Sequence, residues 1–162
     1  MRVEQIMSRP AVTCTAGESV HRAAELMWER DIGCVVVLDD ERRLAGIITD
    51  RDVCMAAYIR GACLSQLPVV DVMKRRVAVV RGDDRLAMAE ALMRSQKVRR
   101  LPVVDAQDRV VGLLSLTDVA RAAQQHRGDE FPEVAGEEIA ATLGAICTPR
   151  HVDPEGASAG VG

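Results

Sequence analysis

The chain has 162 residues, of which 48% are hydrophobic and 28% are charged, an ordinary composition for a folded domain. Its net charge of −3 provides no attraction for nucleic acid, and Trp28, Tyr58 and Phe131 are too few aromatic residues to stack on single strands. No apolar stretch approaches the roughly 20 residues of a membrane span, and the N-terminus has no secretory signal. The five cysteines are irregularly spaced, which is typical of a reduced protein. We therefore expect a cytoplasmic protein that binds neither nucleic acid nor membrane.

The predicted elements begin with a short strand at 12–15 and a helix that starts near Ser19. Apolar residues then recur at helical spacing through Met27, which gives the helix one buried face. The continuous apolar run 34–38 suits a strand buried on both sides. A polar turn at 39–42 leads into a strand at 44–48. A second helix is predicted from about 50 to 57.

The chain then repeats this plan. Residues 3–57 align with 69–123 without a gap, and the identical pairs include Met7/Met73, Leu26/Leu92, Asp39/Asp105, Gly46/Gly112 and Asp52/Asp118. An internal repeat of this kind indicates a duplicated structural unit. The second copy has predicted strands at 78–80, 101–104 and 110–114, a helix at 84–96 with Asp83 or Asp84 as its N-cap, and a helix after Thr117.

This order of elements predicts an α/β (α+β) fold made of two β-α-β-β-α repeats. Neither repeat would bury much core alone, so we expect the two to pack on each other. The predicted boundaries are 1–60 for the first unit, 61–67 for a linker, 68–124 for the second unit and 125–162 for a C-terminal tail. Within the tail, 133–146 fits a short amphipathic helix, and the last residues fit a flexible end.

Two related strings stand at equivalent points of the repeats, Gly46-Ile-Ile-Thr-Asp-Arg-Asp52 and Gly112-Leu-Leu-Ser-Leu-Thr-Asp118. Each places a hydroxyl residue where a strand should end and a helix begin, and an aspartate three residues later. The free N–H groups of a helix N-terminus favour phosphate, the hydroxyl can donate to it, and the carboxylate can accept from a ribose. The same pattern also matches a capping box, which satisfies only the backbone. Its occurrence in both repeats favours a ligand site.

These strings, together with the segments 32–39 and 98–105, resemble those of the CBS domain family over about residues 1–123. Tandem pairs of this domain are also called Bateman modules. The resemblance implies two CBS domains paired around a pseudo-two-fold axis, with two clefts that bind AMP, ADP, ATP or S-adenosylmethionine. It also implies a homodimer and a regulatory role without catalysis.

Carried over position by position, Asp52 and Asp118 resemble the family's ribose-binding acids. Thr49 and Ser115 resemble the hydroxyls that contact phosphate. The implied ligand-binding set is completed by Thr15, Ile32, Gly33, Cys34, Arg51, Val98, Arg99, Arg100, Leu113 and Thr117. Of these, Ile32, Gly33, Cys34, Val98 and Leu113 would enclose the adenine.

The two copies differ at one point of this set, because the first has Gly33-Cys34 where the second has Arg99-Arg100. The basic pair would face phosphates, which favours the cleft that contains Ser115 and Asp118. The alternative is that both arginines are solvated charges.

We therefore predict a regulatory module with no catalytic residues and no required cofactor, whose ligand is an adenine nucleotide and whose partners are a second copy and an unidentified protein. Two alternatives stay open. The clefts could be empty, with the acids acting only as caps in a scaffold for partner proteins. The tail could bind metal or act catalytically, because Cys147 and His151 have a spacing that metals accept.

Overall fold

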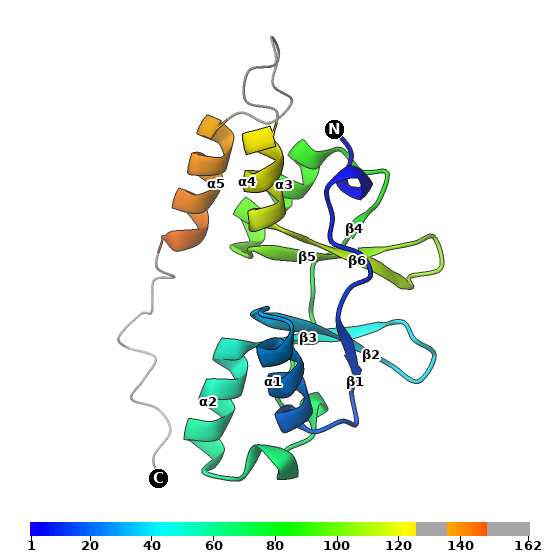
Figure 1. Ribbon diagram of the computed structural model, residues 1–162, viewed down its shortest axis with the longest axis vertical. Helices are drawn as coiled ribbons and strands as arrows, with labels where there is room; N and C mark the ends of the chain where they lie inside the picture. The colour runs from blue at the N-terminus through cyan, green and yellow to red at the C-terminus, as the bar shows by residue number, and fades with distance from the viewer. Residues whose placement is uncertain (126–135, 149–162) are drawn as a thin grey trace.

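The computed structural model describes residues 1–125 and 136–148, which form two similar halves, one above the other in Figure 1. The first half contains β1 (Thr13–Thr15), α1 (Val20–Glu29), β2 (Cys34–Leu38), β3 (Leu44–Thr49) and α2 (Asp50–Arg60). The second contains β4 (Val80–Arg81), α3 (Leu86–Gln96), β5 (Arg100–Val104), β6 (Val110–Ser115) and α4 (Leu116–Gln125). A further helix, α5 (Gly136–Cys147), follows in the tail. The predicted β-α-β-β-α order is confirmed in both halves.

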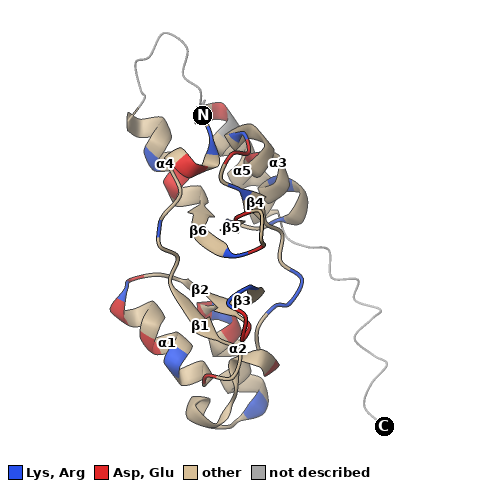
Figure 2. Ribbon diagram, turned by 90° about the vertical axis from the view of Figure 1, so that its right-hand side faces the viewer, with Lys and Arg blue, Asp and Glu red and all other residues tan. Residues whose placement is uncertain are grey.

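Each half has a three-stranded sheet, in the orders β1-β2-β3 and β4-β5-β6. The first pair of strands in each sheet is parallel and the second is antiparallel. The sheets face each other between the helices, as Figure 2 shows from the side. Every residue of β2 is buried, as its continuous apolar run predicts, because helices cover one face of the strand and the other sheet covers the opposite face.

The two halves meet around a pseudo-two-fold axis, which a backbone bridge between Arg43 and Arg109 locates. These two residues occupy the same position of the repeat, just before β3 and β6. Two equivalent residues can pair with each other only where the symmetry axis passes between them.

The segment before each repeat packs on the opposite half. Val3, in the short 3-10 helix η1 (Val3–Gln5), is fully buried in the core of the second half. Its counterpart Val69, in η3 (Val69–Asp71), is fully buried in the core of the first. Between α2 and η3 lies η2 (Leu64–Gln66). The halves therefore exchange their leading segments, and each core is incomplete without the other half.

The glycines of the two motif strings allow this exchange. A side-chain carbon at Gly46 would lie 2.6 Å from the carbonyl oxygen of Lys74, and one at Gly112 would lie 2.9 Å from that of Ser8. Both distances are shorter than packed atoms tolerate. The glycines thus accommodate the backbone of the crossing segment, which a side chain at either position would displace.

Some expected boundaries differ from the structure. The N-cap of α3 is Arg85, so the prediction of Asp83 or Asp84 is wrong. The Asp84 carboxylate instead accepts a 2.8 Å hydrogen bond from the backbone N–H of Arg81 and closes the preceding turn. Helix α2 continues to Arg60 and ends at Gly61, whose φ of 56° lies in the left-handed region that glycine favours.

The predicted tail helix is confirmed as α5, which packs against α3 and α4 in the upper half of Figure 1. The end of the tail, including His151, lies outside the described residues. Over the part of the chain that the structure describes, no helix is long and apolar enough to cross a membrane.

Candidate functional site

The first motif string forms the corner between β3 and α2. Thr49 is the N-cap of α2, and its hydroxyl accepts a hydrogen bond from the backbone N–H of Asp52. The Asp52 carboxylate in turn accepts from the backbone N–H of Thr49 at 3.0 Å and from its hydroxyl at 2.6 Å. This reciprocal pattern is a capping box, which satisfies backbone donors at the start of the helix.

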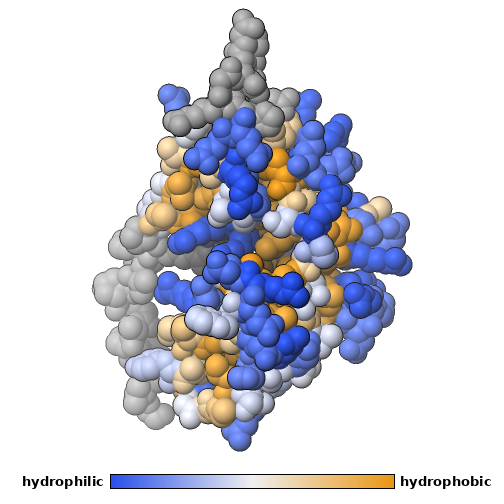
Figure 3. Space-filling model, viewed as in Figure 1, coloured by the Kyte–Doolittle hydropathy of each residue, from blue (hydrophilic) through white to orange (hydrophobic). Residues whose placement is uncertain are grey.

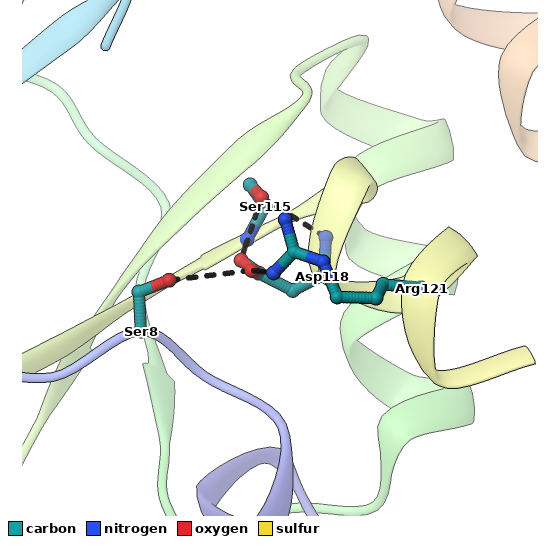
Figure 4. A network of polar contacts seen from close by, with 4 residues as sticks. All are labelled: Ser8, Ser115, Asp118 and Arg121. Atoms are coloured by element: carbon teal, nitrogen blue, oxygen red, sulfur yellow. Dashed lines mark hydrogen bonds and ion pairs between the residues drawn. The ribbon is translucent and has the colours of Figure 1, made fainter. Parts of the chain in front are cut away.

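The second motif string repeats this corner between β6 and α4, as Figure 4 shows. One oxygen of Asp118 accepts from the backbone N–H of Ser115 at 2.8 Å and from its hydroxyl at 2.6 Å. Asp118 is more enclosed than Asp52: its side chain is 7% exposed, whereas that of Asp52 is 15% exposed. The hydrogen bonds of a capping box are therefore present at both corners, as the sequence pattern predicts.

The other oxygen of each aspartate faces the crossing segment from the opposite repeat. Oδ1 of Asp52 lies 3.3 Å from Nζ of Lys74. Oδ1 of Asp118 accepts from the Ser8 hydroxyl at 3.2 Å and lies 3.5 Å from the Arg121 guanidinium (Figure 4). Capping thus uses one carboxylate oxygen, while the second points toward the junction of the two halves.

The sequence did not single out Ser8, Lys74 or Arg121. A signal was present, because Ser8 and Lys74 occupy equivalent repeat positions directly after the paired methionines Met7 and Met73. Arg121 follows Asp118 by three residues on α4, a spacing at which helix side chains meet.

A pocket of about 510 Å³ lies next to the first corner. Its wall contains the predicted residues Ile32, Gly33 and Arg100. The other lining residues are Ala24, Met27, Trp28, Asp31, Asp50, Val53 and Cys54. Arg100 begins β5 in the second half, whereas the rest of the wall belongs to the first half. The pocket is therefore shared between the two repeats.

Gly33 brings two opposite charges together at this pocket. A side-chain carbon at Gly33 would lie 2.9 Å from a guanidinium nitrogen of Arg100 and 3.0 Å from a carboxylate oxygen of Asp50. Burial of the Cys34 thiol raises its pKa, the charge of Arg100 lowers it and the charge of Asp50 raises it. The Arg100 cation and the Asp50 anion thus lie next to Gly33 in the pocket wall, which also contains the acid Asp31.

The other predicted residues lie at different depths around the two corners. The Cys34 side chain is buried at the start of β2, and Val98 packs against the second core. The side chains of Arg51, Arg99 and Thr117 are exposed. Leu113 exchanges two backbone hydrogen bonds with Ser8, at 2.9 and 3.0 Å.

Thr15 lies apart from this group. It pairs with Leu38 at the far end of β2 from Cys34. Its hydroxyl and backbone N–H both donate to the carboxylate of Glu18, at 3.1 and 2.6 Å. Thr15 thus takes part in a local turn.

A second pocket, of about 500 Å³, lies by the two hairpin turns. None of the predicted residues lines it; its wall contains Pro10, Ala11, Thr13, Leu38, Glu41, Arg42, Arg109 and Val110. Within residues 1–125 and 136–148 there is no cluster of three or more His, Cys, Asp and Glu side chains that could hold a metal ion.

Comparisons with known proteins place this arrangement in a family. A model of the CBS domain matches the chain twice, over residues 3–58 and 64–125. The CBS domain-containing protein YhcV of Bacillus subtilis is 32% identical over 141 residues, which cover 85% of this chain and 97% of that protein.

Two solved structures with a similar fold contain bound adenosine compounds. CBSX2, solved in complex with AMP, is 30% identical with a TM-score of 0.69, and the match covers 78% of this chain and 98% of that one. The CBS domain pair of protein MJ0100, solved with 5′-methylthioadenosine and S-adenosyl-L-methionine, is 26% identical with a TM-score of 0.69, and the match covers 75% and 94%.

Proposed function

The chain belongs to the CBS domain family, and on this premise we propose that it is a non-catalytic regulatory module that binds an adenosine-containing ligand between its two CBS domains. AMP, ADP, ATP and S-adenosylmethionine are the candidate ligands. Cytoplasmic location, self-association as a homodimer and an unidentified protein partner belong to the same proposal.

One observation carries this proposal: the pocket beside the α2 N-terminus is completed by Arg100 from the other half. A guanidinium offers several donors in a planar array that suits phosphate or carboxylate oxygens. Half-buried Ile32, together with Met27 and Val53 of the same wall, provides the apolar surface that a purine base requires. Because AMP occupies the related CBSX2 structure, an adenosine ligand is the best-supported choice.

The structure changes which corner we assign to the phosphate. The register pairs Arg100 with Ser115, which supports the predicted grouping with Asp118. Its guanidinium, however, reaches over Gly33 toward the first half. We therefore assign the anionic group of the ligand to the Arg100 side of the shared pocket, near Thr49 and Asp52, and leave the Ser115–Asp118 corner as the second adenosine site.

Regulation follows from the shared construction of the pocket. A ligand that touches both Arg100 and Gly33 contacts both CBS domains, so its affinity depends on how the two domains sit relative to each other. A ligand with unequal affinity for two such arrangements shifts the population toward one of them. The partner protein would respond to that shift.

A second candidate, a ligand-free scaffold, is favoured by the capping boxes, because Thr49–Asp52 and Ser115–Asp118 are already satisfied without a ligand. Calorimetry with the four adenosine compounds separates the two functions. Binding in the micromolar range supports the sensor, and no heat from any of the four supports the scaffold.

A further inference from the structure

The pocket of about 500 Å³ beside the β2–β3 and β5–β6 turns, which we call the hairpin pocket, is separate from the site described above. Its wall shares no residue with the pocket that contains Gly33 and Arg100. Figure 2 looks onto the two turns from the right-hand side of Figure 1. Small-molecule sites have volumes of roughly 300–1,000 Å³, so the hairpin pocket has the size of such a site.

Both halves of the molecule build the hairpin pocket. Arg42 comes from the β2–β3 turn and Arg109 from the end of the β5–β6 turn, while Ala11 belongs to the segment that leads into β1. The backbone bridge between Arg43 and Arg109 joins the two turns at the pseudo-two-fold axis. A ligand held between Arg42 and Arg109 therefore contacts both CBS domains.

The one acid of the pocket wall is neutralised within its own turn. The Glu41 carboxylate lies 2.9 Å from the guanidinium of Arg43, which also lies 3.3 Å from the carboxylate of Asp39. Arg42 takes no part in this cluster, and none of the acids in residues 1–125 and 136–148 forms an ion pair with it. The charge of Arg42 is therefore available to a ligand.

The second turn leaves its arginine available in another way. Arg109 occupies the repeat position of Arg43, but Gln107 stands where the first turn has Glu41. The Asp105 carboxylate accepts from the backbone N–H groups of Gln107 and Arg109, at 2.8 and 2.9 Å. Over the described part of the chain the Arg109 guanidinium has no ion-pair partner, so the pocket wall contains two uncompensated cations.

The rest of the wall is mainly apolar. Leu38 is buried, and Ala11 and Val110 are half-buried. Figure 3 shows hydrophilic residues over the two turns at the right-hand edge and hydrophobic residues just inside them. Thr13 adds a hydroxyl group, which makes no hydrogen bond to any residue that the structure describes. The hairpin pocket thus combines two cations, one hydroxyl and an apolar floor.

We infer that the hairpin pocket binds a small organic phosphate. A phosphate monoester carries about two negative charges at neutral pH, which Arg42 and Arg109 together balance. Guanidinium groups match phosphate oxygens with pairs of parallel hydrogen bonds, and the Thr13 hydroxyl can donate to a further oxygen. The organic part of the ligand packs on Leu38 and Val110. This inference does not depend on adenosine binding, because the two pockets have no residue in common.

The test is titration of the full chain with phenyl phosphate, followed by calorimetry and by the amide signals of the ¹⁵N-labelled protein. We expect shifts at Thr13, Arg42 and Arg109 and none at Gly33 or Asp50. Inorganic phosphate, which lacks the apolar part, and benzoate, which carries one charge, should each bind more weakly. Shifts confined to Gly33 and Asp50, no binding at all, or benzoate binding as tightly as phenyl phosphate would overturn the inference.

Two variants test the arginines directly. Arg42→Asp and Arg109→Gln should each lower the affinity for phenyl phosphate at least about tenfold. Arg42→Asp should preserve the turn, because Arg42 and its repeat counterpart Asp108 have nearly equal φ angles of 62° and 58°. The matched control is Arg60→Gln, at an exposed arginine outside the wall. An equal loss in the control would show attraction by general charge and overturn the site.

Calorimetry with AMP on the same samples separates this inference from the proposed function. AMP binding should be unchanged in Arg42→Asp, whereas phenyl phosphate binding should be unchanged in Arg100→Gln. A chain that binds phenyl phosphate but none of the adenosine compounds would contradict the proposed function alone.

Discussion

The guanidinium of Arg100 occupies the space that a side chain at Gly33 would take, with 2.9 Å between a guanidinium nitrogen and the place where the first side-chain carbon would lie. Arg100 belongs to the second repeat and Gly33 to the first, at neighbouring repeat positions. The first repeat has Gly33-Cys34 where the second has Arg99-Arg100. Because of this difference, Arg100 of the second repeat can lie against Gly33 of the first, across the pseudo-two-fold axis.

Replacing Arg100 with glutamine should weaken the binding of AMP, ADP and ATP. Charge-assisted hydrogen bonds contribute about 1.5–3 kcal/mol, so we expect a loss of roughly 10- to 100-fold in affinity by calorimetry. Arg99→Gln is the matched control, because Arg99 is exposed and does not line the pocket. Equal losses in both variants would show that general charge, and not the pocket, attracts the ligand.

Asp50→Asn should change the preference among ligands. Its carboxylate lies at the pocket wall, where it repels a phosphate and attracts the sulfonium and ammonium groups of S-adenosylmethionine. We expect AMP affinity to rise and S-adenosylmethionine affinity to fall, each by about fivefold for roughly 1 kcal/mol of screened interaction. Asp40→Asn, in the β2–β3 turn, should alter neither. Parallel changes for both ligands would contradict the assigned charge contact.

Gly112→Ala should destabilise the protein by about 1–3 kcal/mol, since the added methyl group meets the Ser8 carbonyl oxygen and the Met7 sulfur. Gly46→Ala should behave alike. Gly17→Ala is the control, because nothing lies within 4 Å of its added carbon. Urea denaturation measures all three, and an unchanged midpoint for Gly112→Ala would refute the role of this glycine in the crossing.

Val3→Ala tests whether the first residues complete the core of the second half. Val3 is fully buried there, and removing two methylene-sized groups costs about 2 kcal/mol. Val111→Ala should cost far less, because Val111 is 38% exposed. The comparison uses the free energy of unfolding, and equal losses at the two sites would argue against the exchanged segments.

Thiol reactivity should follow burial and hydrogen bonding. Burial raises the pKa of Cys14 to about 11, and burial likewise raises the pKa of Cys34. The Ser65 hydroxyl and backbone N–H lower the pKa of exposed Cys63. Because the thiolate is the nucleophile, iodoacetamide at pH 8 should modify Cys63 well before Cys14 and Cys34. Mass spectrometry of digested protein reads the order, and early labelling of Cys34 would contradict the buried start of β2.

The repeat predicts the fold because hydrophobic periodicity and turn residues are local signals. The run 34–38 is a buried strand, and the Thr49–Asp52 pair begins a helix, as expected. The exchange of segments was not predictable in this way. Val3 and Val69 are ordinary apolar residues in sequence, and only the three-dimensional pairing of the halves determines which core each of them enters.

The sequence predicts the two strand-to-helix corners of the site but not the contacts that each corner makes with the opposite repeat. The repeated strings identify Asp52 and Asp118, whereas their contacts with Lys74 and Ser8 cross between repeats. The direction of the Arg100 side chain likewise depends on the space that Gly33 leaves in the opposite half. Thr15, which the family resemblance places in the ligand site, pairs with Leu38, whereas Thr49 of the first corner pairs with Cys34 at the opposite end of β2.

The most direct measurement is calorimetric titration of the purified chain with AMP, ADP, ATP and S-adenosylmethionine, repeated with Asp52→Asn and Asp118→Asn. We predict micromolar binding of at least one compound and its loss in one or both variants, with the free energy of unfolding lowered by no more than about 1 kcal/mol. Absence of binding by all four compounds to the wild-type chain would contradict the adenosine-sensing function and leave Asp52 and Asp118 as helix caps in a scaffold.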